Sequence, residues 1–350
     1  MKKSISYITF IQTRKNHDVF YSLITSCIDD NLKLVVFKID DYEYTIIRGE
    51  NKKKIGLFSL IYLLLLYVPQ SKFIILEEVY RIRCLRALFL KFFDFKTIYI
   101  VHNVNRFLYN KTKYRLRFHS LLTLLYSQKE ILSREVPYIS TYCIPFQLHA
   151  KPALLACNVP QPPLTFTLIG DVDQNRKDIF TVLDSFIRIL NDGYNIKLQL
   201  LGKIKSPEIK NMLIKLNSPN IIYYSEFIPE DKFLIEIARS DFLVLSVNEK
   251  FEIDKISYEI YGKTKATGIY YFAMSFGIPT LVNNEYYLDD YLKSLAFTFQ
   301  NTDELYQLVK RLLIGQLVPD RQRILDSSSK WKKNIFEDLS CFKNFINGEL

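Results

Sequence analysis

The chain has 350 residues, of which 49% are hydrophobic and 24% are charged, and its formal net charge at pH 7 is +10. This composition excludes an intrinsically disordered protein, and the length is sufficient for two domains. The five cysteines are widely scattered without a CxxC pair, which favours a reduced cytoplasmic protein over a disulfide-stabilised secreted one. The basic N-terminus has no apolar signal-peptide region, so we interpret it as the start of a first strand.

Strands and helices alternate along residues 1–150. The sequence predicts strands at residues 4–11, 32–39, 73–76 and 97–102, and helices at residues 18–27, 55–68 and 79–93. Alternation of this kind is typical of a mainly parallel sheet with helices on both faces. We therefore expect residues 1–150 to form one Rossmann-like α/β domain.

Residues 151–163 interrupt this pattern with four prolines and predict a linker, after which the alternation resumes. Strands are predicted at residues 164–169, 196–201, 221–223, 242–247 and 280–282, and helices at residues 177–190, 207–216, 229–238 and 267–276. We expect residues 164–330 to form a second Rossmann-like domain that faces the first across a cleft. Residues 331–350 are expected to form a helix that crosses back to the first domain. Ligands of such sheets bind outside the carboxyl ends of the strands.

The positive charge is concentrated in the first half of the chain. Residues 1–150 contain 23 Lys and Arg against 12 Asp and Glu, so they carry the whole net charge. Such a surface attracts polyanions, including anionic lipid headgroups and pyrophosphate-linked lipids. Two basic clusters, residues 52–54 and 106–117, have the apolar run 55–68 between them, and this run is too short to span a bilayer. It is either a buried helix or an apolar face at a membrane surface with basic anchors.

A lysine-bearing loop, residues 261–268, leads into the predicted helix at 267–276. Helix N-termini present unpaired N–H groups and a partial positive charge, which favours phosphate binding. Thr267 and Gly268 stand where these donors point, with Lys263 and Lys265 beside them. The same segment also matches an ordinary loop–helix–strand unit, so its interpretation depends on the rest of the second half.

The second half carries a set of short motifs at its predicted strand ends. They are Leu168-Ile-Gly170-Asp171 followed by Arg176-Lys177, Leu201-Gly202, Glu226-Phe-Ile-Pro229, Ala238-Arg-Ser-Asp241 leading to Ser246, and Gly277-Ile-Pro279. Their order and spacing resemble the nucleotide-sugar-binding domain of retaining glycosyltransferases of the GT-B fold, the family-4 or group 1 type, in a divergent form of the bacterial surface-polysaccharide class. The resemblance covers about residues 165–285. In the first half, residues 98–103 look like the family's strand that ends in a cleft-facing histidine.

This resemblance implies transfer of a sugar from a nucleotide-sugar donor to a glycan acceptor, with retention of configuration and without a metal or cofactor. The residues expected to bind the donor diphosphate are Arg176, Lys177, Lys265, Thr267 and Gly268. The catalytic candidate is His102, which can act as a base or donate a hydrogen bond to a sugar, although a polar strand end would also explain it. Asn103 and His17 are candidates on the acceptor side.

The resemblance also implies a cellular context. The expected acceptor is lipid-linked and belongs to surface-polysaccharide synthesis, and no nucleic-acid partner is expected. The protein is then cytoplasmic and peripheral on the inner face of the membrane, because its basic half would face the anionic leaflet.

Departures from the family pattern leave a second function open. The family's two glutamates, eight positions apart, are replaced by Thr264 and Phe272, counted back from Gly277. The usual glycine-rich turn after the first strand is also absent. The alternative is therefore a catalytically silent scaffold protein of a polysaccharide assembly complex, unless Glu249 or Glu259 replaces a lost carboxylate.

Other kinds of site are less well supported by the sequence. Asp171 and Asp173 look like a metal-holding Asp-x-Asp pair, but a turn or cap explains them better. Glu77 and Glu78 end a predicted strand, and a helix-start acid explains one of them. A dehydrogenase is disfavoured because no GxGxxG follows the first strand of either half, and a nucleic-acid-binding protein because there is no reader motif.

Overall fold

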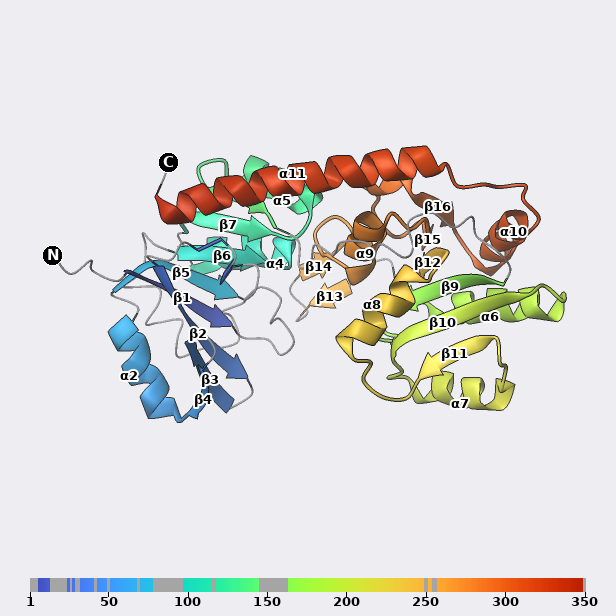
Figure 1. Cartoon of the computed structure of the whole chain (residues 1–350), viewed down its shortest axis with the longest axis horizontal. Helices are drawn as coiled ribbons and strands as arrows, with labels where there is room; N and C mark the ends of the chain where they lie inside the picture. The colour runs from blue at the N-terminus through green and yellow to red at the C-terminus, as the bar shows by residue number, and fades with distance from the viewer. Residues whose placement is uncertain are drawn as a thin grey trace. The chain divides into compact units, whose positions relative to one another are not determined.

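The computed structural model divides the chain into two compact units (Figure 1). Unit 1 consists of Met1–Gln147 and Asn334–Leu350, and unit 2 of Leu148–Lys333. The residues that the structure describes are 6–12, 24–25, 27–28, 32–40, 43–48, 51–67, 70–77, 97–114, 118–144, 163–248, 251–253 and 257–348. The predicted helix 79–93 and His17 lie outside the described residues, as do most of the predicted helix 18–27 and of the linker 151–163.

The described residues of unit 1 form a mixed sheet with the strand order β4-β3-β2-β1-β5-β6-β7-β8. The strands are β1 Ser6–Gln12, β2 Leu32–Asp40, β3 Glu43–Arg48, β4 Asn51–Ile55, β5 Ser71–Glu77, β6 Thr97–Val101, β7 Ser120–Thr123 and β8 Ser140–Cys143. The helices are α2 Leu57–Tyr67, α4 Val104–Tyr114 and α5 Tyr126–Glu135. Neighbouring strands are parallel except at one edge, where β3 and β4 form an antiparallel hairpin next to β2.

The centre of this sheet is apolar on both faces. β5 and β6 are buried along almost their whole length. Parallel strands that are covered on both faces carry continuous apolar runs, which is why the sequence predicted both of them. The core of unit 1 joins residues of the sheet, such as Phe37, Ile74 and Tyr99, with Phe107 of α4 and Leu60 of α2.

The hairpin of β3 and β4 was not predicted from the sequence. Residues 52–54 were interpreted as a basic cluster, and the structure places them in an exposed strand at the edge of the sheet. The predicted helix 55–68 forms as α2, but its buried residues are only Leu60 and Leu64. The interpretation of this run as a buried helix is therefore wrong for its outer face. No helix in the part of the chain that the structure describes is long and apolar enough to cross a membrane.

Unit 2 contains a parallel sheet with the strand order β11-β10-β9-β12-β15-β16. Its strands are β9 Leu164–Ile169, β10 Ile196–Lys203, β11 Ile221–Tyr224, β12 Phe242–Leu245, β15 Thr280–Asn283 and β16 Ala296–Phe299, and β13 Phe251–Ile253 pairs with β14 Ser257–Glu259 in a separate antiparallel ribbon. The helices are α6 Ile179–Asn191, α7 Pro207–Leu216, α8 Glu230–Ala238, α9 Gly268–Phe276, the 3₁₀ turn η4 Leu292–Ser294 and α10 Thr302–Leu313. The strand order reverses between β9 and β12, as in doubly wound nucleotide-binding sheets.

Local sequence signals explain the helices that border this sheet. Asp178 caps α6, and its carboxylate accepts a hydrogen bond from the Thr181 amide at 3.2 Å. α9 ends at Gly277, whose φ of 63° lies in the left-handed region that glycine adopts without strain. The stacked rings of Phe166 and Phe242 lie at the centre of the core. Two α/β units with mainly parallel sheets confirm the predicted fold class.

The last helix, α11 Arg321–Asn347, contributes residues to both units. In unit 2 the Ser328 hydroxyl donates to the Met274 carbonyl at 2.5 Å. In unit 1 Asp338 accepts hydrogen bonds from Lys129 Nζ at 2.6 Å and from the Cys143 amide at 2.8 Å. The ring of Phe345 packs against Phe73 with the ring centroids 5.0 Å apart. The sequence predicted a C-terminal helix at residues 331–350, and α11 begins about ten residues earlier, at Arg321.

Candidate functional site

The first part of the candidate site lies where the strand order of unit 2 reverses. The turn after β9 begins at Gly170, whose φ of 81° requires glycine, and it reaches Lys177 seven residues later. Lys177 forms a bridge with Val247, which follows β12, and the Asp178 amide donates to the Ser246 carbonyl at 3.1 Å. The turn after β9 is thus attached to the end of β12, at the crevice where such sheets bind their ligands.

A second glycine allows the neighbouring strand to approach this turn. A Cβ atom at Gly202 would lie 2.3 Å from the carbonyl oxygen of Gly170, a distance that real contacts do not reach. The Gly170 amide also donates to the Leu201 carbonyl at 3.0 Å. Gly202 is therefore required so that the backbone of β10 can contact the backbone of the turn. The sequence motif Leu201-Gly202 has this packing role.

Lys177 is the most perturbed cation of this region. Its ammonium group donates to the carbonyl of Ile169 at 2.7 Å and to that of Asp171 at 2.9 Å. Burial lowers the pKa of Lys177 from 10.5 to about 8, and the charge of Asp171 acts against this shift. A lysine with this pKa is still largely protonated at pH 7, so it presents a poorly hydrated positive charge near the crevice.

Arg176 connects this turn to the loop that precedes α9. Its guanidinium hydrogen-bonds the hydroxyl of Tyr261. Burial raises the pKa of Tyr261, and the Arg176 charge acts against that shift. The structure therefore brings Arg176, which follows β9, into contact with Tyr261 at the start of the loop 261–268. Tyr261 was not assigned a role from the sequence, because a tyrosine before a glycine gives no distinctive signal.

The loop 261–268 is held in a defined conformation by its own backbone. The Gly262 amide donates to the Lys265 carbonyl at 2.9 Å, and the Ile260 amide donates to the Thr264 hydroxyl at 2.8 Å. Gly262 has a φ of 81°, and a Cβ atom there would lie 2.1 Å from the Tyr287 carbonyl oxygen. This loop is therefore preorganised, and it places Lys265 three residues before the start of α9.

α9 begins at Gly268 with Thr267 as its N-cap residue. The Thr267 side chain makes no capping hydrogen bond, and its hydroxyl lies 3.0 Å from the hydroxyl of the buried Tyr286. The backbone donors of the first turn are thus not used by that side chain. Because β12 and β15 are parallel neighbours, the helix that connects them begins at the carboxyl edge of the sheet. This is the same edge to which Lys177 belongs.

The two positions where the resembling family carries glutamate hold residues with structural roles. Thr264 is buried within the loop, and Phe272 packs edge-to-face against Phe233 with the ring centroids 5.5 Å apart. Glu259, considered as a replacement carboxylate, is fully buried at the end of β14, and Glu249 lies outside the described residues. The structure therefore gives no carboxylate at either expected position.

The acidic pair Asp171 and Asp173 has other partners. Asp171 forms an ion pair with Lys205 at 2.5 Å, and Asp173 accepts a hydrogen bond from the Asn175 amide at 3.1 Å. The second contact is an Asx turn, which agrees with the interpretation of the pair as a turn element.

Asn283 was missed by the sequence analysis. Its side chain accepts a hydrogen bond from the Val247 amide at 2.9 Å and donates one to the Val247 carbonyl at 2.7 Å, so it joins the ends of β12 and β15.

A second group of polar residues lies in unit 1, at the carboxyl ends of β5 and β6. His102 follows β6, and its Nε2 lies 3.0 Å from Oε1 of Glu77, the last residue of β5. Both side chains are buried. The side-chain Nε2 of Gln128 donates to the His102 carbonyl at 3.2 Å, which fixes the backbone at this point. Asn103 is also buried, and its carbonyl accepts from Phe107 in the first turn of α4.

The pairing of Glu77 with His102 was not predicted. The two residues are 25 positions apart, and only the pairing of β5 with β6 brings them together. Glu77 is a strand-end residue bonded to a histidine, so the helix-start interpretation does not apply to it. The two adjacent glutamates at the end of a predicted strand, Glu77 and Glu78, stood out in the sequence. The sequence did not indicate that Glu77 pairs with His102.

Comparison with known proteins gives a clear result for the fold. No family model and no curated protein matches the sequence. Among solved structures, the chain superimposes on a sucrose-phosphate synthase from Thermosynechococcus elongatus with a TM-score of 0.63 and 12% identity, over 98% of this chain and 100% of that one. The chain has the GT-B fold.

Two further GT-B structures are similar over nearly their whole length. The catalytic domain of starch synthase IV from Arabidopsis thaliana, bound to ADP and acarbose, gives a TM-score of 0.58 at 9% identity and covers 96% of this chain and 99% of that domain. WaaG, a glycosyltransferase involved in lipopolysaccharide biosynthesis, gives 0.56 at 12% identity and covers 97% of this chain and 100% of WaaG. At these identities the similarity establishes the GT-B fold, as the sequence resemblance implied.

Proposed function

We propose that this GT-B protein is a glycosyltransferase that transfers a sugar from a nucleotide-sugar donor to a glycan acceptor. The observation that supports it most directly is the position of Arg176 and Lys177, where the strand order of unit 2 reverses. Ligands of doubly wound sheets bind at this crevice. The structural neighbours are glycosyltransferases, and one of them was solved with ADP.

The donor side of the proposal rests on charge. A nucleoside diphosphate leaving group gains negative charge as the glycosidic bond breaks, so fixed donors and cations stabilise the transition state. In this proposal Arg176, Lys177 and Lys265 supply the cations. The first amides of α9, at Thr267 and Gly268, supply hydrogen-bond donors and the positive end of the helix dipole. These groups would neutralise the diphosphate without a metal ion.

The acceptor side of the proposal rests on His102. The Glu77 carboxylate, 3.0 Å away, can fix the orientation and tautomer of the imidazole ring. A ring held in this way can accept a proton from a sugar hydroxyl or donate a hydrogen bond to it. We propose His102 as the catalytic residue, Glu77 as its positioning residue and Asn103 as an acceptor contact. We also propose His17 as an acceptor contact, on the basis of the sequence alone.

The finer description follows the family resemblance. We propose a retaining hexosyl transfer in surface-polysaccharide synthesis, with a lipid-linked acceptor and without a cofactor. The excess of basic residues in positions 1–150 supports contact with a lipid pyrophosphate or an anionic leaflet. In this proposal the protein is cytoplasmic and lies on the inner face of the membrane.

One observation favours a second candidate function. Thr264 and Phe272 occupy the positions of the family's two glutamates and are used for loop geometry and apolar packing. A protein with the fold but without these carboxylates could be a scaffold of a polysaccharide assembly complex that turns over no donor. Nucleotide binding and donor consumption distinguish the two candidates.

The proposed function is tested by isothermal titration of the full chain with UDP, ADP, GDP, dTDP and CMP. We expect saturable binding of one nucleotide, at least about tenfold weaker in an Arg176→Gln, Lys265→Gln variant, because two cations at the diphosphate are lost. Arg188→Gln is the matched control, since Arg188 is exposed and pairs with Asp303.

Each outcome of this titration has a meaning. Binding that the double variant leaves unchanged would contradict the placement of the diphosphate. Failure of the wild type to bind any nucleotide would contradict the enzyme proposal and favour the scaffold. With the bound nucleotide identified, His102→Ala is expected to lower donor consumption without weakening nucleotide binding.

A further inference from the structure

The outer face of α2 is apolar and exposed to solvent. The side chains of Phe58, Tyr62 and Leu65 are 87%, 66% and 57% exposed, and Leu57, Ile61 and Leu66 of the same helix are exposed as well. The sequence carries no charged residue from Ile55 to Ser71. A helix on the surface of a soluble protein normally turns a polar face to water, so α2 is unusual in having none.

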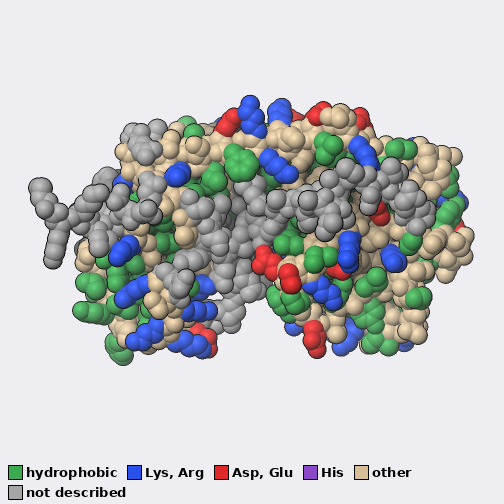
Figure 2. All heavy atoms as spheres, viewed as in Figure 1, with side chains coloured by type: hydrophobic (Ala, Val, Ile, Leu, Met, Phe, Trp, Pro, Cys, Tyr) green, Lys and Arg blue, Asp and Glu red, His purple; other side chains and the backbone are tan. Residues whose placement is uncertain are grey.

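Cationic side chains lie directly beside this face. Lys52, Lys53 and Lys54 form most of β4, an edge strand whose lysines are all exposed. Arg48 is at the end of β3, opposite Asn51 in the register of the hairpin. Figure 2 shows blue basic and green hydrophobic side chains gathered together over the hairpin and α2. Among the described side chains of the hairpin, the carboxylate is that of Glu43, which forms an exposed ion pair with Lys54 at 3.3 Å.

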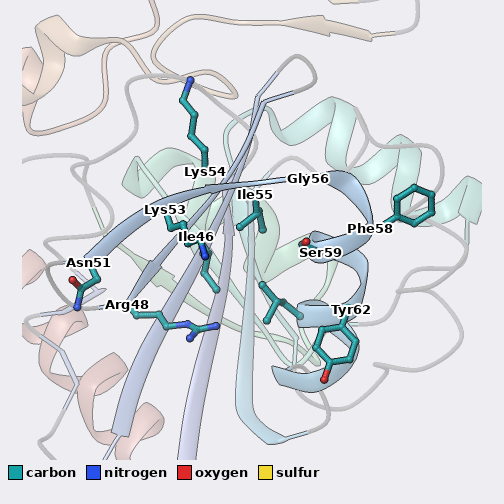
Figure 3. Close-up of a pocket in the computed structure, with 11 residues that line it drawn as sticks. Ile46, Arg48, Asn51, Lys53, Lys54, Ile55, Gly56, Phe58, Ser59 and Tyr62 are labelled. Carbon is teal, nitrogen blue, oxygen red and sulfur yellow. The ribbon is translucent and has the colours of Figure 1, made fainter.

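A groove of about 750 Å³ separates the hairpin from α2 (Figure 3). The hairpin side of the groove is lined by Ile46, Arg48 and Lys53, and the helix side by Phe58 and Tyr62. The Arg48 guanidinium lies 4.9 Å from the centre of the Tyr67 ring, which holds it on the α2 side of the hairpin. The groove therefore combines positive charge with apolar and aromatic walls.

We infer that α2 and the β3–β4 hairpin together form a docking surface for an anionic lipid bilayer. In this arrangement α2 lies in the plane of the interface with Phe58, Tyr62 and Leu65 among the acyl chains. Arg48 and the lysines of β4 contact lipid phosphate groups, some of which enter the groove. An 11-residue helix is about 16 Å long, which is too short to cross the hydrocarbon core but suits an interfacial position.

Charge complementarity favours a bilayer over a second copy of the chain. A symmetric dimer through this face would bring its lysines toward those of the partner, which is unfavourable. An anionic leaflet attracts them instead. This inference deepens the proposed function, since it rests on a lipid-linked acceptor and names the surface that meets the membrane. Its test does not involve a nucleotide, so the failure of either proposal can be recognised separately.

The test is co-sedimentation of the full chain with vesicles of phosphatidylcholine alone and with vesicles that also contain phosphatidylglycerol. We expect binding to the anionic vesicles that weakens as salt is added. A Phe58→Ser, Tyr62→Ser variant and a Lys52→Gln, Lys53→Gln variant are each expected to bind at least about tenfold more weakly, because apolar insertion and lipid electrostatics are lost in turn.

Two control variants make the test specific. Phe336→Ser removes an exposed ring from α11, and Lys210→Gln, Lys215→Gln removes two exposed cations from α7; both are expected to leave vesicle binding unchanged. All four variants change only surface residues, so each is expected to fold. Circular dichroism checks this. Equal vesicle binding by wild type and both α2–hairpin variants would overturn the inference. So would a concentration-dependent dimer that disappears in the Phe58→Ser, Tyr62→Ser variant while anionic vesicles are not bound.

Discussion

At the scale of single residues, the candidate donor site depends on groups whose properties are set by burial. The Lys177 ammonium group donates hydrogen bonds to two backbone carbonyls. Its pKa is lowered because this group is buried away from water. A bound diphosphate would add negative charge near this lysine. The lowered pKa therefore has a consequence for ligand binding near neutral pH.

The affinity for the nucleoside diphosphate is expected to fall as the pH rises through about 8, the pKa of Lys177. Below this pH the ammonium is charged and attracts the phosphates; above it the neutral amine does not. Titration calorimetry at pH 7 and pH 9 measures the effect, which we expect to be several-fold. Lys177→Arg should bind equally at both values, because a guanidinium stays charged. If the affinity of Lys177→Arg fell equally between pH 7 and pH 9, the pH dependence would have to come from other groups.

Gly202 is expected to tolerate no side chain. In Gly202→Ala the new Cβ atom would lie 2.3 Å from the Gly170 carbonyl oxygen, so the backbone of the turn must shift. We expect a loss of about 2–4 kcal/mol in the free energy of unfolding, measured with urea. Gly193→Ala is the matched control: Gly193 has a φ of 85° with no atom within 4 Å, so only backbone strain of about 1–2 kcal/mol applies. Equal losses for the two variants would refute the close approach.

At the scale of elements, α11 contributes residues to both units. Its first part donates a hydrogen bond from Ser328 to α9, and its last part places Phe342 and Phe345 against Tyr142 of β8. A helix with apolar contacts in both units is stabilised by tertiary packing more than by its own propensity. Asp338 makes two polar contacts that hold this last part, with Lys129 and with the Cys143 amide.

Asp338→Ala is expected to destabilise unit 1. The substitution removes the partner of the Lys129 ammonium and of the Cys143 amide, both partly buried, and should cost about 1–3 kcal/mol. Hydrogen exchange of β8 and α5 would report the loss, together with urea unfolding. Asp326→Ala, on an exposed part of the same helix where Asp326 bonds only Gln322 among the contacts described, is expected to change stability by less than about 0.5 kcal/mol. If both substitutions had the same effect, the contacts of Asp338 would contribute nothing specific.

At the scale of the whole molecule, each unit has its own core and its own group of candidate residues. The donor-side residues all belong to unit 2, and the His102–Glu77 pair and the α2–hairpin surface belong to unit 1. The excess of basic residues also lies in the first 150 positions. The proposed tasks of donor binding and acceptor or membrane contact are thus separated along the chain. This separation is why nucleotide titration and vesicle binding can test them independently.

Much of the fold could be predicted because parallel strands leave a strong pattern. The buried run 73–76 is continuous and apolar, and the strand at 164–169 is followed directly by a turn that begins at Gly170. The hairpin at 43–55 escaped prediction because three consecutive lysines do not alternate with apolar residues. They are tolerated in a strand only because β4 is an edge that faces water. The exposed face of α2 was misjudged for a related reason, since an apolar run does not reveal whether it is covered.

The sequence by itself determined the alternation of strands and helices, the glycines of the tight turns and the charges that follow β9. These features depend on residues close together in the chain, where side-chain type and backbone preference act directly. Only the tertiary structure decided that Glu77 meets His102, that Arg176 meets Tyr261 and that Gly202 meets Gly170. Each of these pairs depends on which strands or loops become neighbours, and that is settled by the packing of the whole sheet rather than by any local segment.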